Sequence, residues 1–212
     1  MSKIFLLAVC LLFHVLTPAQ ADPLCTYSTY KWNTIQGKAV EFKRIEKRYS
    51  QLTKFERDAM TGCTVCEQDQ VAVKLDNIDE FKVCHVLAEP LREVLSVLIS
   101  SGQGVIETVV AYRVGMTRGD VDAHGNRTGF SNHSFGIAID INSEHNGLYD
   151  QCLVFNASCR LIKGGPWRPG QNRLSLSHDS EIVQKLKRLG WVWGGQIAGK
   201  QKDFMHFSTT GY

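Results

Sequence analysis

The stretch at residues 131–140 reads SNHSFGIAID. Its second half alternates, so that in a strand the isoleucines from Ile137 onward share one face and Asp140 lies on the other. We expect the isoleucines to face a core, which turns Asp140 away from it. His133 lies seven residues before Asp140, and Gly136 between them allows a turn. A turn followed by a strand can therefore bring His133 and Asp140 to one point.

A second histidine, His206, lies in the aromatic stretch FMHF, residues 204–207, and Asp203 precedes it by three positions. Catalytic zinc is commonly held by three nitrogen or oxygen ligands at about 2.0–2.2 Å, with a fourth position left to water. His133, Asp140 and His206 would complete such a set. Asp203 is then close enough in sequence to accept a proton from that water. Residues three apart in a straight strand face opposite ways, so this hypothesis requires a turn or bulge after Asp203.

Together these motifs resemble the family of D-alanyl-D-alanine carboxypeptidases and L-alanyl-D-glutamate endopeptidases. The resemblance depends on residues 131–140, on WGG at 193–195 and on DFMHF at 203–207, in matching order and spacing. It covers roughly Val86 to Tyr212. It implies the fold shared with the hedgehog signalling domain, which is an α+β fold with a small central antiparallel sheet flanked by helices.

The resemblance also implies roles for individual residues. It implies three zinc ligands: His133, Asp140 and His206. Asp203 takes the place of the family's acidic base in zinc-assisted amide hydrolysis. The family places an arginine near the end of the strand before the first motif, where it contacts a substrate carboxylate or the developing oxyanion. Arg113 matches this position best, and Arg118 and Arg127 are alternatives.

Residues 1–21 are typical of an export signal. Lys3 is followed by an apolar run from Ile4 to Leu16 that is too short to span a bilayer, and AQA at 19–21 predicts cleavage after Ala21. No later stretch is apolar for long enough to cross a membrane. The mature chain is therefore predicted to be secreted or periplasmic, without an integral membrane segment.

Signal cleavage leaves an even set of cysteines: Cys25, Cys63, Cys66, Cys84, Cys152 and Cys159. An exported chain with such a set predicts three disulfides. Cys152 and Cys159 are each other's nearest neighbours among the cysteines, and we expect them to be bonded. The pair Cys63 and Cys66 could also be a redox motif or half of a structural zinc site, although an oxidising destination favours simple cross-links.

Ahead of the predicted zinc peptidase domain at 83–212, residues 22–82 form a cysteine-containing segment with no counterpart in the family. Between Lys38 and Met60 apolar side chains recur every three or four positions, which predicts one or two amphipathic helices. Further elements are expected along the chain: a strand at 71–73, a helix at 83–101, a core strand at 105–113, a polar loop at 115–130, a helix at 180–189, and strands at 191–193 and 204–207.

Residues 120–126, DVDAHGN, resemble the start of a calcium loop. His124 stands where an oxygen ligand is expected, and no glutamate follows at the twelfth position of the loop. A polar turn is the plainer interpretation, with calcium as the less favoured one.

The leading functional hypothesis is a monomeric zinc peptidase that cleaves peptidoglycan stem peptides. The sequence leaves open which peptide bond is cut. The alternative is a non-catalytic, zinc-stabilised binding or signalling module of the hedgehog-like fold, against which the presence of Asp203 argues. An accidental resemblance in a disulfide-rich secreted protein is a third interpretation. With 24 basic and 21 acidic residues, the chain is too nearly balanced in charge to suggest nucleic acid as a partner.

Overall fold

The computed structural model describes residues 21–211, so the predicted export signal lies outside the described residues except for Ala21. The described part mixes helices and strands, as the α+β class predicts. Its helices are α1 (His85–Ser100) and α2 (Glu181–Arg188). Its strands are β1 (Leu24–Asn33), β2 (Lys38–Arg48), β3 (Gln70–Leu75), β4 (Ile78–Cys84), β5 (Val109–Val110), β6 (Met116–Val121), β7 (Arg127–Phe130), β8 (Ala138–Ile141), β9 (Leu148–Asp150), β10 (Arg160–Lys163), β11 (Val192–Trp193), β12 (Lys202–Asp203) and β13 (His206–Ser208).

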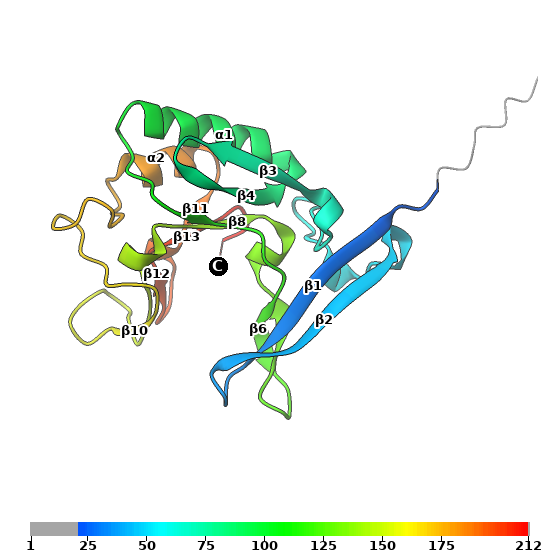
Figure 1. The fold of residues 1–212 in the computed structure, drawn as a ribbon. Coiled ribbons are helices and arrows are strands. Elements are labelled where there is room, and N and C mark those ends of the chain that lie inside the picture. Colours follow the sequence, from blue (N-terminus) through cyan, green and yellow to red (C-terminus); the bar gives the residue numbers. More distant parts are fainter. Residues whose placement is uncertain (1–20, 212) are drawn as a thin grey trace, which may run out of the picture.

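A four-stranded antiparallel sheet in the order β11-β13-β8-β5 lies at the centre of the molecule, below α1 and α2 (Figure 1). The isoleucines Ile139 and Ile141 of β8 are fully buried, as their alternation predicts. They join a core with Leu91 and Leu95 of α1 and Leu186 of α2. This core fixes β8 and β13, the two strands that carry the central polar residues.

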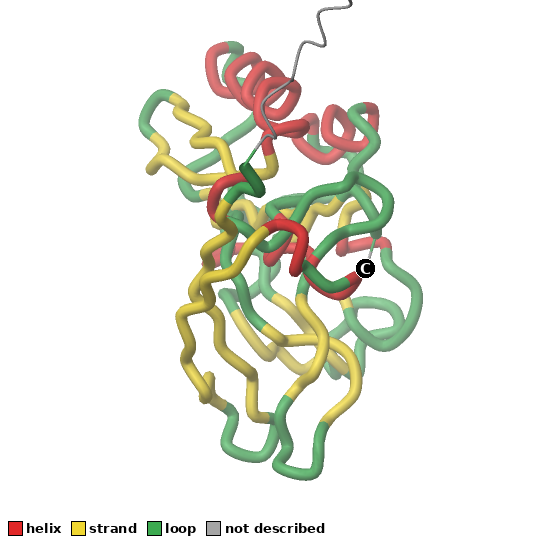
Figure 2. Tube along the Cα trace, turned by 90° about the vertical axis from the view of Figure 1, so that its right-hand side faces the viewer, coloured by secondary structure: helices red, strands yellow, loops and turns green. Residues whose placement is uncertain are grey.

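Two strand hairpins lie side by side at one end of the molecule. β1 and β2 form a long hairpin, and β6 and β7 form the second one. The two hairpins join in one sheet, because Lys31 of β1 pairs in parallel with Met116 of β6 (Figure 1). The tips of both hairpins meet, because Thr34 donates its backbone N–H to Gly125 O at 2.8 Å. Asn33 also donates to Asn126 at 2.8 Å. Figure 2 shows both tips pointing the same way.

Three disulfides are present in the described residues, as predicted. They join Cys25 to Cys66, Cys63 to Cys84, and Cys152 to Cys159. Because Cys63 and Cys66 have different partners, they are neither a redox pair nor half of a zinc site. The first two bonds tie the start of β1 to the β3–β4 hairpin, whose Val73 and Val83 belong to the same core as α1.

The prediction of helices between Lys38 and Met60 is wrong, because this stretch forms β2 and two short 3-10 turns. Its apolar spacing did not mark a buried helical face: Phe42 is 73% exposed and Phe55 is 71% exposed. Pairing with β1 decides the conformation instead. The segment before residue 83 is thus built of strands and turns.

Elsewhere the elements follow the sequence more closely. The strand at 71–73 and the helices at 83–101 and 180–189 are confirmed with small shifts of their ends. The expected core strand at 105–113 shortens to β5, and the expected polar loop at 115–130 contains the hairpin β6–β7. Within residues 21–211 no helix combines the length and apolar character that crossing a bilayer requires.

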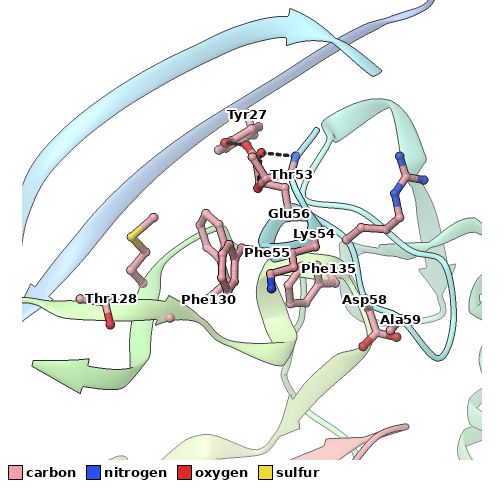
Figure 3. Close-up of a pocket in the computed structure, with 13 residues that line it drawn as sticks. Tyr27, Thr53, Lys54, Phe55, Glu56, Asp58, Ala59, Thr128, Phe130 and Phe135 are labelled. Carbon is pink, nitrogen blue, oxygen red and sulfur yellow. Dashed lines mark hydrogen bonds between the residues drawn. The ribbon is translucent and has the colours of Figure 1, made fainter. Parts of the chain in front are cut away.

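A buried carboxylate, Glu56, holds the segment before residue 83 together (Figure 3). It accepts hydrogen bonds from Tyr27, from Lys47 at 2.7 Å, and from the hydroxyl and backbone N–H of Thr53, each at 2.9 Å. Burial by itself raises the pKa of Glu56, but these bonds outweigh it and lower the pKa from 4.5 to about 2. The folded protein therefore favours the ionised carboxylate.

This depressed pKa predicts a stability effect that depends on pH. Above the unfolded-state pKa of 4.5 the stabilisation is fully present, and it is lost as the pH falls toward the folded-state pKa of about 2. Glu56→Gln should lower the free energy of unfolding by roughly 2 kcal/mol at neutral pH, and the difference from wild type should shrink between pH 4.5 and 2. Urea titrations at several pH values measure it. The exposed Glu89→Gln on α1 is the control and should have little effect on stability; a pH-independent Glu56→Gln effect would contradict the assignment.

Candidate metal centre and cleft

His133 is presented by a short 3-10 turn, Asn132–Phe135, that ends at Gly136 in the left-handed conformation (φ 66°). Its ring is buried, and Nδ1 lies 2.9 Å from the carbonyl oxygen of Ala111. A carbonyl only accepts, so Nδ1 carries the proton and donates it. In the neutral ring Nε2 then carries a lone pair, which points toward Asp140.

Asp140 and His206 lie directly opposite each other on the adjacent strands β8 and β13 of the central sheet. His206 Nδ1 lies 3.1 Å from Asp140 Oδ1 and 3.2 Å from His133 Nε2. His133 Nε2 lies 3.1 Å from the same carboxylate oxygen. The structure thus brings together the three residues that the sequence predicts as ligands, from two strands and the turn before one of them.

The three facing atoms are His133 Nε2, Asp140 Oδ1 and His206 Nδ1. They are arranged better for binding a metal ion than for hydrogen bonding to one another. A lone pair on His133 Nε2 next to a carboxylate oxygen has no proton to donate, so a shared cation would stabilise the group. Tetrahedral zinc with bonds of about 2.0–2.1 Å places its ligand atoms about 3.3–3.4 Å apart. The observed separations of 3.1, 3.1 and 3.2 Å lie within a few tenths of an ångström of that spacing. Two imidazole nitrogens and one carboxylate are also a donor set that zinc prefers.

A proton shared with the histidines can take the place of a metal cation beside Asp140. Burial by itself raises the pKa of Asp140, but the positive charge and hydrogen bonds of protonated His133 and His206 outweigh burial and hold the pKa well below the usual range. Its second oxygen, Oδ2, accepts a hydrogen bond from Arg113 Nη2 at 3.1 Å. Arg113 therefore lies at the edge of the cluster, where it orients Asp140 and remains partly exposed.

Asp203 ends β12, and His206 begins β13 in a different sheet. A turn at Phe204–Met205 separates them, which is the break that the predicted role of Asp203 requires. The turn is held by Trp193, whose ring N–H donates to Phe204 O at 2.9 Å. Gly194 makes room for it, because a Cβ there would lie 2.3 Å from Asp203 O.

A cleft of about 600 Å³ opens over the cluster. Asp203 lines it together with the three cluster residues, and so do all three arginines that the sequence offers for substrate contact: Arg113, Arg118 and Arg127. The cleft also has two aromatic lining residues that the sequence analysis missed, Tyr30 and Trp32 of β1. Their alternate spacing, which places both on one face of a strand, was the available signal.

Residues 120–126 form the end of β6 and a polar turn that leads into β7. Asp122 Oδ1 accepts the backbone N–H groups of His124 and Asn126, each at 2.9 Å. Asn126 in turn donates to Glu41 of β2 at 3.0 Å. These side chains therefore join the two hairpin tips.

Residues 124–209 match the family described as D-alanyl-D-alanine carboxypeptidase. The match spans less than half of the 212 residues and contains the cluster residues and Asp203. It confirms the resemblance over this region and supports a peptidase. Comparison with curated proteins and with solved structures gave no match.

Proposed function

Because residues 124–209 match the D-alanyl-D-alanine carboxypeptidase family, we propose that this chain is a secreted zinc peptidase that hydrolyses amide bonds in peptidoglycan stem peptides. The observation that carries the proposal is the convergence of His133, Asp140 and His206 on one point beneath an open cleft. Export is supported by the disulfides, which persist in oxidising compartments. The central antiparallel sheet under two helices is compatible with the hedgehog-like fold that the resemblance implies.

In this proposal the chain's residues divide the work. His133, Asp140 and His206 hold the metal, which supplies Lewis-acid activation of water and of the scissile carbonyl. Asp203 takes the proton from the attacking water and passes it to the leaving amine, so that no covalent enzyme intermediate is needed. Arg113, oriented by Asp140, directs its remaining N–H donors toward a substrate carboxylate or the developing oxyanion.

Metal removal is the first test. Dialysis against a chelator is expected to abolish cleavage of purified peptidoglycan, and one equivalent of zinc should restore it, because the three ligand residues form one site. Metal analysis gives the stoichiometry, and mass analysis of released fragments identifies the bond that is cut. Hydrolysis that persists at full rate without metal would contradict the proposal.

The same experiment separates the alternative, a zinc-stabilised binding module without activity. That function predicts one bound zinc, a thermal midpoint that falls on chelation, and no released fragments. Asp203 favours the peptidase, because a carboxylate lining the metal cleft outside the ligand set has a use in proton transfer.

A further inference from the structure

The β1–β2 hairpin supplies one wall of the cleft. Tyr30 and Trp32 of β1 line the same cleft as His133 and His206, although they precede the region of the family match. Trp32 is 39% exposed, so part of its indole is open to a ligand. We call Tyr30 and Trp32 the aromatic wall.

The aromatic wall is fixed relative to the rest of the cleft. The ring of Tyr30 packs on the backbone of Gly115, where a Cβ would come within 2.6 Å of the ring. Lys31, between the two aromatic residues, pairs with Met116 at the start of β6. The tip of the hairpin is bonded to the β6–β7 turn through Thr34. The wall is thus part of a continuous sheet, and its surface is preorganised for binding.

Cationic side chains line the same cleft as the aromatic wall. Arg118 and Arg127, from the adjoining hairpin, line the cleft, and Lys163 lines it as well. The carboxylates among the lining residues are Asp140 and Asp203, which the proposed function assigns to the metal centre. The cleft thus combines cationic side chains with apolar ring surface. Guanidinium groups bind carboxylates in a bidentate manner, and aromatic faces pack on aliphatic groups.

We propose that Tyr30, Trp32 and Arg118 form a substrate subsite for an anionic part of the peptide. The subsite rests on the proposed peptidase function. It specifies the part of the substrate that the β1–β2 hairpin would bind. The chemical class is a peptide with a free carboxylate next to aliphatic groups. In a stem peptide the α-carboxylate of the γ-linked glutamate has this character. The aromatic wall sets affinity, while the metal centre sets the rate of bond cleavage.

The test compares two synthetic stem pentapeptides that differ only in whether this glutamate carboxylate is free or amidated. Trp32→Ala is expected to raise KM for the free form about tenfold with kcat within about twofold, and Trp32→Phe should restore most of the loss. Amidation should raise the wild-type KM about tenfold but leave the KM of Arg118→Gln nearly unchanged, since its partner is already absent. Phe55→Ala removes an exposed aromatic ring outside this cleft and should behave as wild type.

The outcomes separate this subsite from the proposed function. Wild-type cleavage with unchanged KM in Trp32→Ala overturns the subsite and leaves the peptidase intact. Where the wild type cleaves neither peptide, calorimetry on the zinc-loaded protein decides: binding that depends on Trp32 and on the free carboxylate supports the subsite and overturns the peptidase. Absence of both cleavage and binding overturns both. Equal zinc content and equal thermal midpoints confirm that each variant is folded.

Discussion

Replacing Asp203 by asparagine is expected to lower kcat for stem-peptide cleavage by a factor of about 10²–10⁴, the usual range for loss of a general base. Asparagine keeps the shape of the side chain but cannot accept the proton of the attacking water. Zinc content should stay at one equivalent, because the proposed ligand set consists of His133, Asp140 and His206. Steady-state kinetics and metal analysis on the same sample measure both quantities.

A conservative variant and a control variant test the role of Asp203 further. Asp203→Glu retains a carboxylate and should recover part of the activity, whereas Asp179→Asn, whose side chain is 94% exposed, should leave kcat unchanged. Full activity in Asp203→Asn would show that another group moves the proton. Loss of zinc together with activity would instead make Asp203 a support for the metal site.

The second large effect is expected at Gly136, which ends the turn that presents His133. Its φ of 66° disfavours any L side chain by about 1–2 kcal/mol. A Cβ there would also lie 1.9 Å from Gln70 Oε1 and 2.6 Å from the backbone nitrogen of Cys84. Gly136→Ala should therefore lower the free energy of unfolding by about 3 kcal/mol or more, with a marked loss of zinc affinity. Urea unfolding and a competitive zinc titration measure the two.

The turn between β1 and β2 offers a matched control. Gly37 has a φ of 62° but no atom within 4 Å of its would-be Cβ, so Gly37→Ala carries the backbone cost alone, about 1–2 kcal/mol. The double variant Gln70→Ala/Gly136→Ala should be less destabilised than the sum of its single changes, because the side-chain overlap is removed. Equal effects at Gly136 and Gly37 would show that the contact with Gln70 and Cys84 is unimportant.

The cluster of His133, Asp140 and His206 was predictable from the sequence because its residues lie in short, dense motifs. The alternation before Asp140 placed it on a definable strand face, and the structure pairs that strand directly with the one that carries His206. The sequence showed that Asp203 could act beside His206 only if a turn separated them. That turn depends on contacts with Trp193 and Gly194, about ten residues earlier in the chain. Contacts of this kind follow from packing and not from spacing.

The segment before residue 83 was misread for a related reason. Its apolar residues fit a helical period, yet β2 has no fully buried face that could have produced a regular pattern. The strand exists because β1 offers a long partner, a non-local contact that propensity does not encode. The aromatic wall was missed with it, since Trp32 matters only after the hairpin is placed beside β6.

The contact between Gly136 and Cys84 also links a disulfide to the turn that presents His133. Cys84 is bonded to Cys63, and its backbone N–H donates to Gly136 O at 2.9 Å. Oxidation of this pair therefore fixes the backbone against which the His133 turn closes. We expect metal loading to follow oxidation, so that a chain with Cys63 and Cys84 reduced acquires zinc poorly. Weaker zinc uptake by the reduced protein in a competition titration checks this order, and equal uptake by reduced and oxidised protein contradicts it.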